Sequence, residues 1–208
     1  MRTALEAALS IAVDTLYPPS RLAEVVGTIQ RDYPTVSLDV RTGTLSAVVA
    51  QVHSGDSHVG ITGMSELPPE LVPGPCDLVE LIAVAAPQHP LHALKGAASD
   101  EALREHTNIV LSAPAKVDEQ GPQTHLEGKI WRINDSEARR TLVCAGLGWA
   151  RLPRHPVEKD LEERVLLRQS TTRWKRKNTV VPLRTIYRRD HPPGPAGCSF
   201  LERISAAH

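Results

Sequence analysis

Apolar residues recur with two different periods at the start of the chain. Over residues 9–13 they alternate with small or polar positions, which predicts a buried strand. From Leu22 they follow the spacing i, i+3, i+4, i+7, which predicts a helix over 19–32. Pro34 ends that helix, because the residue before a proline avoids the α region. A strand therefore runs directly into a helix.

The same two periods return further along the chain. Residues 35–41 alternate like a strand, and the helical spacing follows over 44–53, where Gly55 is placed to end the helix. A short apolar strand follows over 58–62. Strands and helices that alternate through short turns indicate parallel strands joined by right-handed crossovers. The first 62 residues are therefore predicted to form an α/β unit.

A second α/β unit is predicted from about residue 87. Before it, a proline-rich surface crossing over 65–75 leads into a long apolar strand over 78–86. The elements expected after it are a helix at 100–105, a strand at 108–111, a polar loop at 112–128, a strand at 129–133, a helix from Asp135 to Gly146, strands at 149–152, 165–167 and 180–187, and an amphipathic helix at 195–206.

Composition and charge place the chain among ordinary globular proteins. The 24 Lys and Arg residues balance 24 Asp and Glu residues, so no overall field draws the chain to DNA or to an anionic membrane. No signal peptide and no apolar run of membrane-spanning length are present. Three cysteines, far apart in the sequence, favour reduced thiols and a cytoplasmic location.

The sequence offers little support for an enzyme. No G-x-S-x-G elbow, P-loop or HExxH motif occurs. The glycines at 146–148 follow a predicted helix, so they are interpreted as its end and not as a dinucleotide fingerprint. The 89–92 stretch, HPLH, is interpreted as a turn, because proline interrupts the histidine pair and no further ligand completes a metal set. We therefore expect no catalytic residue, no metal and no cofactor.

Aromatic residues are expected to serve packing. Tyr17 and Trp149 are interpreted as packing residues, and Phe200 as part of the core. Trp174 lies within the basic stretch 173–177, a pattern that nucleic-acid-binding segments share. A solvated loop is the expected structure of that stretch.

Several segments in a fixed order resemble the effector-binding domain of LysR-type transcriptional regulators. The segments are IAVDTLYPPSRL, DYPTVSLDV, RTGTLSAVVAQVHSGDSHVGITG, LIAVAAPQHPL, INDSEARRTLVCAGLGWARLP and LRTIYRRDHP. The resemblance runs from about residue 8 to residue 205. It implies an α/β fold of two Rossmann-like lobes joined by two crossovers, like the type II periplasmic binding proteins, with a small-molecule site in the cleft between the lobes.

The resemblance also implies a division of the chain. Lobe I is expected to comprise residues 1–86 and 192–208, and lobe II residues 87–191. The family's N-terminal winged helix-turn-helix, which binds DNA, is expected to be absent from this chain. The sequence departs from the family at His58, where an acid is usual, at His92, where an apolar or aromatic residue is usual, and in the loop at 112–128.

Candidate effector contacts lie where predicted parallel strands end, because ligands bind beyond the carboxyl ends of such strands. Thr15 is the leading candidate, at a strand-to-helix junction whose unpaired N–H groups and helix dipole favour an anion. A simple helix cap is the alternative interpretation there, and loop or cap chemistry is the alternative in lobe II. The expected contacts are Asp14, Thr15, Leu16, Thr42, Gly43, Thr44, Thr62 and Gly63 from lobe I, and Ser112, Asn134 and Asp135 from lobe II.

The sequence therefore predicts a non-enzymatic sensor of a small metabolite, for which a carboxylate is a candidate group. The expected partners are that metabolite, DNA through the absent domain only, and a second copy in a homodimer, with a tetramer as the alternative at full length. No membrane partner is expected. A stand-alone solute-binding protein and an enzyme on the same fold are the alternatives.

Overall fold

The computed structural model describes residues 6–111, 128–174 and 180–206 of the chain. The backbone divides into two compact units, Met1–Leu78 with Pro182–His208, and Val79–Val181. Both division points fall within strands, β4 (Leu71–Ala85) and β9 (Val180–Arg188). The lobe boundaries expected at 86/87 and 191/192 lie just past the ends of these same strands and remain a proposal.

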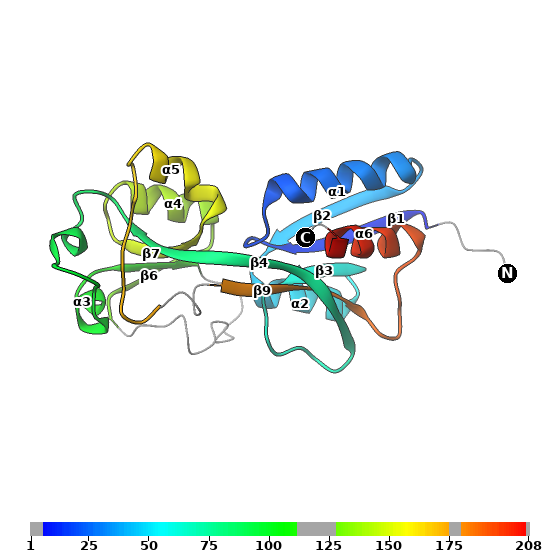
Figure 1. Cartoon of the computed structure of the whole chain (residues 1–208). Coiled ribbons are helices and arrows are strands. Elements are labelled where there is room, and N and C mark those ends of the chain that lie inside the picture. Colours follow the sequence, from blue (N-terminus) through cyan, green and yellow to red (C-terminus); the bar gives the residue numbers. More distant parts are fainter. Residues whose placement is uncertain (1–5, 112–127, 175–179, 207–208) are drawn as a thin grey trace. The chain divides into compact units, whose positions relative to one another are not determined.

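The first unit alternates strands and helices as the periods predict. Its strands follow the order β2-β1-β3-β9-β4; β1 is parallel to β2 and β3, and β9 is antiparallel to β3. The elements are β1 (Ala8–Asp14), α1 (Pro19–Asp32), β2 (Ser37–Gly43), α2 (Leu45–Ser54), β3 (Val59–Thr62) and α6 (Pro195–Ala206). Figure 1 shows α1 and α6 on one side of this sheet and α2 on the other.

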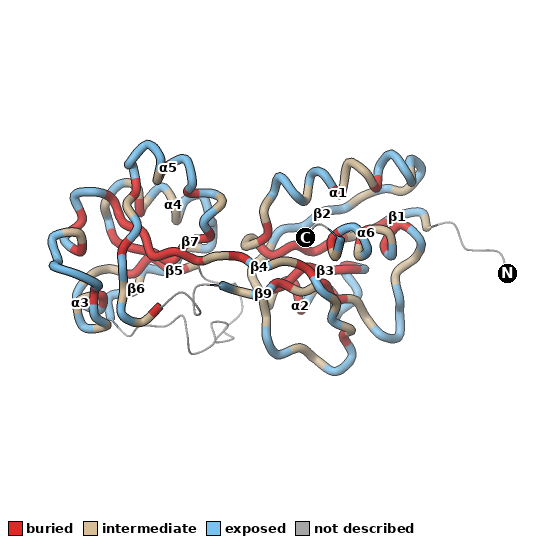
Figure 2. The backbone as a smooth tube through the Cα atoms, viewed as in Figure 1, coloured by how far each residue is buried: buried red, intermediate tan, exposed pale blue. Residues whose placement is uncertain are grey.

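Successive side chains of β1 point to opposite faces of the sheet and enter the core on both sides. Leu9 and Ile11 are fully buried, and Leu9 lies near Gly197 of α6. Ala12 points to the other face, where it belongs to a buried cluster with Val48 and Val52 of α2. Figure 2 shows β1 as a buried strand between layers of helices with exposed outer surfaces.

The second unit has the strand order β4-β7-β5-β6, with the short β8 antiparallel to β4. Strands β5, β6 and β7 are mutually parallel where they pair, and β7 is antiparallel to β4. Its further elements are η1 (Pro90–Ala93), α3 (Asp100–Arg104), β5 (Asn108–Leu111), β6 (Ile130–Ile133), α4 (Ser136–Cys144), β7 (Trp149–Pro153), η2 (His155–Val157), α5 (Glu158–Glu162) and β8 (Leu167–Arg168).

Side chains of β4 and β7 alternate between two buried clusters. Even-numbered residues such as Ile82 and Leu152 pack with Val143 of α4 and Val157 of η2. Odd-numbered residues face the other way: Ala85 and Trp149 form a cluster with Leu91, Ala98, Leu103 and Trp174. The sheet of the second unit therefore has an aliphatic cluster on one face and a cluster with two tryptophans on the other.

Three expectations for these elements are wrong. The proline-rich segment is not a surface crossing throughout, because residues 71–75 belong to β4. Pro73 and Pro75 are two residues apart, so both positions without an N–H face the same side of the strand. The pairing of β4 with β7 begins at Leu81, beyond both prolines. The strand expected at 165–167 begins at Leu167.

The third wrong expectation concerns Trp174. Its side chain is 8 % exposed and belongs to a core cluster, so it does not lie in a solvated loop. The basic residues 175–177 and nearly all of the loop expected at 112–128 lie outside the described residues. Tyr17, Trp149 and Phe200 are buried, which confirms their interpretation as packing and core residues.

Candidate functional site

The carboxyl ends of three strands meet at one edge of the first unit's sheet. The register pairs Val13 with both Thr42 and Ile61, and Asp14 with Gly43. Because β1, β2 and β3 are parallel, the residues that follow them emerge at the same edge. All the expected contacts from lobe I therefore lie together there: Asp14, Thr15, Leu16, Thr42, Gly43, Thr44, Thr62 and Gly63.

The backbone N–H groups between β1 and α1 are already bonded within the chain. Thr15 donates its N–H to Gly43 O at 3.0 Å, and Tyr17 donates its N–H to Asp14 O at 2.9 Å. The N–H of Leu16 bonds Asp14 Oδ1 at 2.9 Å, and the two residues after Tyr17 are prolines, which have no N–H. Asp14 is 2 % exposed. The N–H groups of Thr15, Leu16 and Tyr17 are therefore not open to an anion, because Gly43 O and Asp14 already accept them, and an anion site at the start of α1 stays a prediction.

The sequence contained a signal for this arrangement that was not used. An aspartate often accepts a hydrogen bond from the backbone N–H two residues later, forming a local turn. Asp14 stands two residues before Leu16 and ends a buried strand, so its carboxylate has this N–H as the nearest donor.

The start of α2 is built differently. Thr44 occupies the N-cap position with extended backbone angles, as predicted, but its side chain makes no capping hydrogen bond. Its Oγ1 is buried and has no hydrogen-bond partner among the residues that the structure describes. Next to it, Thr62 Oγ1 donates to Leu45 O at 3.2 Å and accepts from the N–H of Met64 at 3.2 Å. A buried hydroxyl without a partner is costly, so Thr44 marks a place where a ligand atom would be stabilised.

The expected contacts from the second unit lie at the start of α4. Asp135 is the N-cap, as predicted, and its Oδ1 accepts the N–H of Ala138 at 2.6 Å. Asn134 precedes it, and both residues are exposed. Ser112 lies outside the described residues. For Asp135 the structure thus shows cap chemistry, which was the alternative interpretation.

Two arginines in the second unit were missed by the sequence reasoning. Arg139 of α4 donates Nε to Ile109 O and Nη2 to Arg151 O, both at 2.8 Å, and so bridges β5 and β7. Burial and the neighbouring charge of Arg151 lower the pKa of Arg139 to about 10. Burial and Arg173 lower the pKa of Arg151 to about 10. The signal was that Arg139 shares a helical face with Leu142 and Val143, where an apolar residue is expected.

His58 replaces an acid of the family pattern without losing a hydrogen-bond acceptor. Its Nδ1 accepts the backbone N–H of Ser10 at 3.0 Å, and its own backbone N–H donates to Ser10 Oγ at 3.1 Å. An imidazole nitrogen without a proton accepts this bond as a carboxylate oxygen does. The residue therefore ties the start of β3 to β1.

The histidines at 89 and 92 belong to a turn, as predicted. His89 precedes η1, and its Nδ1 accepts the N–H of Leu91 at 3.3 Å. Its ring lies 5.1 Å from that of His106, and burial lowers its pKa to about 4. Among the described residues, no group of three or more His, Cys, Asp or Glu side chains is arranged to hold a metal ion.

The features described above match a known protein family. Two units with parallel strands are joined by β4 and β9, and polar residues gather where strands of the first unit end. The family model for the LysR substrate binding domain matches residues 2–208. The chain belongs to this LysR family. Its fold is that of the type II periplasmic binding proteins, with two Rossmann-like lobes, as expected from the sequence.

Solved LysR-type regulatory domains share the fold at low sequence identity. The regulatory domain of MetR from N. meningitidis is 20 % identical, with a TM-score of 0.75 over 96 % of this chain and 92 % of that one. The effector-binding domain of QuiR in complex with shikimate is 15 % identical, with a TM-score of 0.74 over 96 % and 95 %. The Synechocystis PCC6803 CcmR regulatory domain in complex with 2-PG is 17 % identical, with a TM-score of 0.74 over 96 % of each chain.

The curated proteins include no sequence that matches this chain. Over the described residues, the structure contains no helix with the length and apolar character needed to cross a membrane.

Proposed function

We propose that the chain is the effector-sensing domain of a LysR-type transcriptional regulator. It binds a small metabolite with contacts from both lobes and controls transcription through a winged helix-turn-helix elsewhere in the regulator. The family match supports this function, and the solved structures of the QuiR and CcmR domains are complexes with shikimate and with 2-PG. The chain is not an enzyme in this proposal.

The buried Oγ1 of Thr44 is the observation that carries the proposal for the first lobe. It lies at the start of a ten-residue helix, where the helix dipole favours negative charge. A carboxylate oxygen of the effector accepts a hydrogen bond from the Thr44 hydroxyl there. Thr15, Leu16, Thr42, Gly43, Thr62 and Gly63 surround that position, with Asp14 holding the adjacent turn. Ser112, Asn134 and Asp135 are the proposed contacts from the second lobe.

The partners and location follow from the same proposal. The regulator works in the cytoplasm as a homodimer of these domains, or as a tetramer at full length, and meets DNA only through its winged helix-turn-helix. Effector binding shifts the balance between two arrangements for which its affinity differs. A solute-binding protein for transport is the second candidate function, because the fold itself is shared with periplasmic binding proteins.

Thermal-shift screening with shikimate, 2-PG and a panel of aliphatic and aromatic acids tests the binding. A ligand that binds the folded state raises the melting temperature, and the rise grows with the logarithm of the ligand concentration above its dissociation constant. Thr44→Val keeps the shape of the side chain and removes the hydroxyl, so we expect a confirmed ligand to bind about tenfold more weakly.

Thr28→Val is the matched control. The Thr28 hydroxyl bonds Glu24 O within α1, away from the strand ends, so ligand binding should be unchanged. Equal binding to wild type and Thr44→Val would place the ligand elsewhere. A transcription assay with the full regulator, with and without the ligand, separates a sensor from a transport protein.

A further inference from the structure

An open groove of about 570 Å³ runs along the first half of β4. This volume falls within the roughly 300–1,000 Å³ that is typical of small-molecule pockets. Residues 73–78 of β4 and 182–184 of β9 line the groove. All of these residues belong to the first unit, and none is among the proposed effector contacts.

The wall of the groove is apolar and rigid. Pro73, Pro75 and Pro182 are exposed there, and proline rings lose no side-chain entropy when a ligand covers them. Leu78 is 64 % exposed, more than any other large exposed hydrophobic residue of the described chain. A single exposed leucine is ordinary, but contiguous apolar surface in a groove is typical of a binding site. The body of a ligand in this groove is therefore expected to be apolar.

Arg184 places a positive charge in the same groove. Its side chain is partly exposed, and Nη1 donates to Ser65 O at a long distance of 3.5 Å. Among the residues that the structure describes, no carboxylate forms an ion pair with this guanidinium, and Ser65 O is its one hydrogen-bond acceptor. A guanidinium with free N–H groups binds a carboxylate through two parallel hydrogen bonds.

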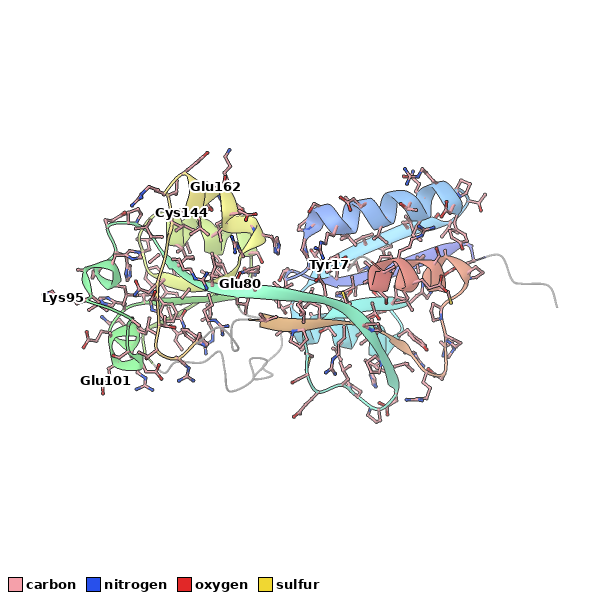
Figure 3. All side chains as sticks on the ribbon, viewed as in Figure 1. Tyr17, Glu80, Lys95, Glu101, Cys144 and Glu162 are labelled. Atoms are coloured by element: carbon pink, nitrogen blue, oxygen red, sulfur yellow. The ribbon has the colours of Figure 1, made fainter. Side chains whose placement is uncertain are left out.

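The two carboxylates of β4 already have cations of their own. Asp77, in the wall of the groove, pairs with Arg21 of α1, and its Oδ1 accepts the N–H of Leu78 at 2.7 Å. Glu80, which Figure 3 labels further along β4, pairs with two arginines of the second unit. The charge of Arg184 is therefore in excess at the groove, which favours an anionic group on the ligand.

We propose that this groove binds an apolar monocarboxylate. The carboxylate accepts hydrogen bonds from the guanidinium of Arg184, and the apolar body covers Leu78 and the three prolines. Arg184 pairs with Thr62 of β3, so the groove lies beside the edge where the effector contacts gather, but it uses none of them. The site goes beyond the proposed effector function and does not depend on it.

Calorimetry and NMR spectroscopy on the complete chain test the groove with phenylbutyrate and octanoate at millimolar concentrations. Phenylbutyramide, a neutral molecule of nearly the same shape as phenylbutyrate, is the matched ligand control. We expect both acids to bind, and the amide to bind about fivefold more weakly than its acid. In isotope-labelled protein the backbone amide signals of Gly74, Leu78 and Arg184 should shift, whereas those of Thr15 and Thr44 should not.

Two variants separate the charge from the apolar wall. Arg184→Gln removes the cation, so it should weaken binding of the acids about fivefold and leave the amide unchanged. Leu78→Asn keeps the approximate size of the side chain and removes apolar surface, so it should weaken the acids and the amide alike, by about fivefold. Arg189→Gln changes an exposed arginine just after β9, outside the groove, and should bind as wild type does.

Three results would overturn the groove site. In the first, neither acid binds; in the second, Arg184→Gln binds the acids as tightly as wild type. In the third, Thr44→Val loses the binding, which would assign the acids to the effector site and leave the proposed function standing.

Sedimentation velocity tests whether a second copy of the chain occupies the groove. If Leu78→Asn converts a dimer into a monomer and no acid binds to wild type, the groove is an interface between copies and not a ligand site. Far-ultraviolet circular dichroism confirms that each variant is folded.

Discussion

Arg140 and Asp160 form a two-point ion pair that joins α4 to α5. Arg140 Nε lies 2.6 Å from Asp160 Oδ2, and Nη2 lies 2.6 Å from Oδ1. The Asp160 side chain is 7 % exposed and that of Arg140 is 29 % exposed. Glu137, on the solvent side, accepts a third bond from Arg140. Parallel double bonds between guanidinium and carboxylate are the strongest geometry for such a pair.

We expect Arg140→Met to destabilise the protein by about 3 kcal/mol, because it leaves the buried Asp160 carboxylate without its cation. Denaturant unfolding measures the loss. Glu137→Gln, which removes only the exposed partner, should cost less than about 0.5 kcal/mol. In the double variant with Asp160→Asn, part of the loss should return; strictly additive losses would contradict a direct pair.

His89 should make the protein sensitive to mild acid. Its pKa in the folded state is about 4, below the ordinary value of 6.5, because burial disfavours the charged ring. Between these two pKa values the unfolded chain binds more protons than the folded one. Stability is therefore fully present above pH 6.5 and falls as the pH drops toward 4, by up to about 1.4 kcal/mol per pH unit.

Urea unfolding at a series of pH values between 4 and 7 measures this dependence. His89→Asn keeps an acceptor for the N–H of Leu91 and cannot be protonated, so its stability should change less over the same range. His191→Asn is the control, since that exposed ring pairs with Asp190 at the surface. An unchanged slope in His89→Asn would assign the acid sensitivity to other groups.

Glu6 connects the beginning of the described chain to its last helix. Its Oε2 accepts the N–H of Ala196 at 2.7 Å, in the first turn of α6. A carboxylate at a helix start satisfies an unpaired N–H and complements the dipole. We expect Glu6→Ala to cost about 1 kcal/mol in unfolding free energy.

Glu202→Ala, on the exposed side of α6, is the matched control and should stay within about 0.5 kcal/mol of wild type. Hydrogen exchange adds a local measurement: the amides at the start of α6 should lose protection in Glu6→Ala before the rest of the helix does. Equal protection in both variants would show that Glu6 does not hold the helix.

Two glycines should respond to alanine in opposite directions. A Cβ on Gly60 of β3 would lie 2.8 Å from Val52 Cγ2 and 3.0 Å from Ile186 Cγ1, inside the core. We expect Gly60→Ala to destabilise by about 1–3 kcal/mol through overpacking. Gly27 lies within α1, and a Cβ there meets nothing within 4 Å. Gly27→Ala should stabilise by about 0.5–1 kcal/mol, because alanine loses less entropy in a helix. Thermal unfolding of the two variants side by side checks both signs.

Local patterns predicted the regular elements well. The helices expected at 19–32 and 195–206 have the bounds of α1 and α6, and Thr44, Gly55 and Asp135 occupy the helix ends predicted for them. These features depend on periods and caps that a short segment carries by itself. The gathering of the first-lobe contacts could also be predicted, because parallel strands leave their carboxyl ends at one edge.

Side-chain partners that lie far away in the sequence could not be predicted. The N–H of Thr15 after β1 is closed to an anion by Gly43 O, which only the tertiary fold brings there, whereas the bond from Leu16 to the Asp14 carboxylate is local. The segment with Pro73 and Pro75 is part of β4, which its local pattern did not predict. The amino-acid pattern alone determined the elements and the edge at which a ligand is expected. The tertiary structure decided which polar groups at that edge are already satisfied, because hydrogen bonding and burial there depend on residues that are distant along the chain.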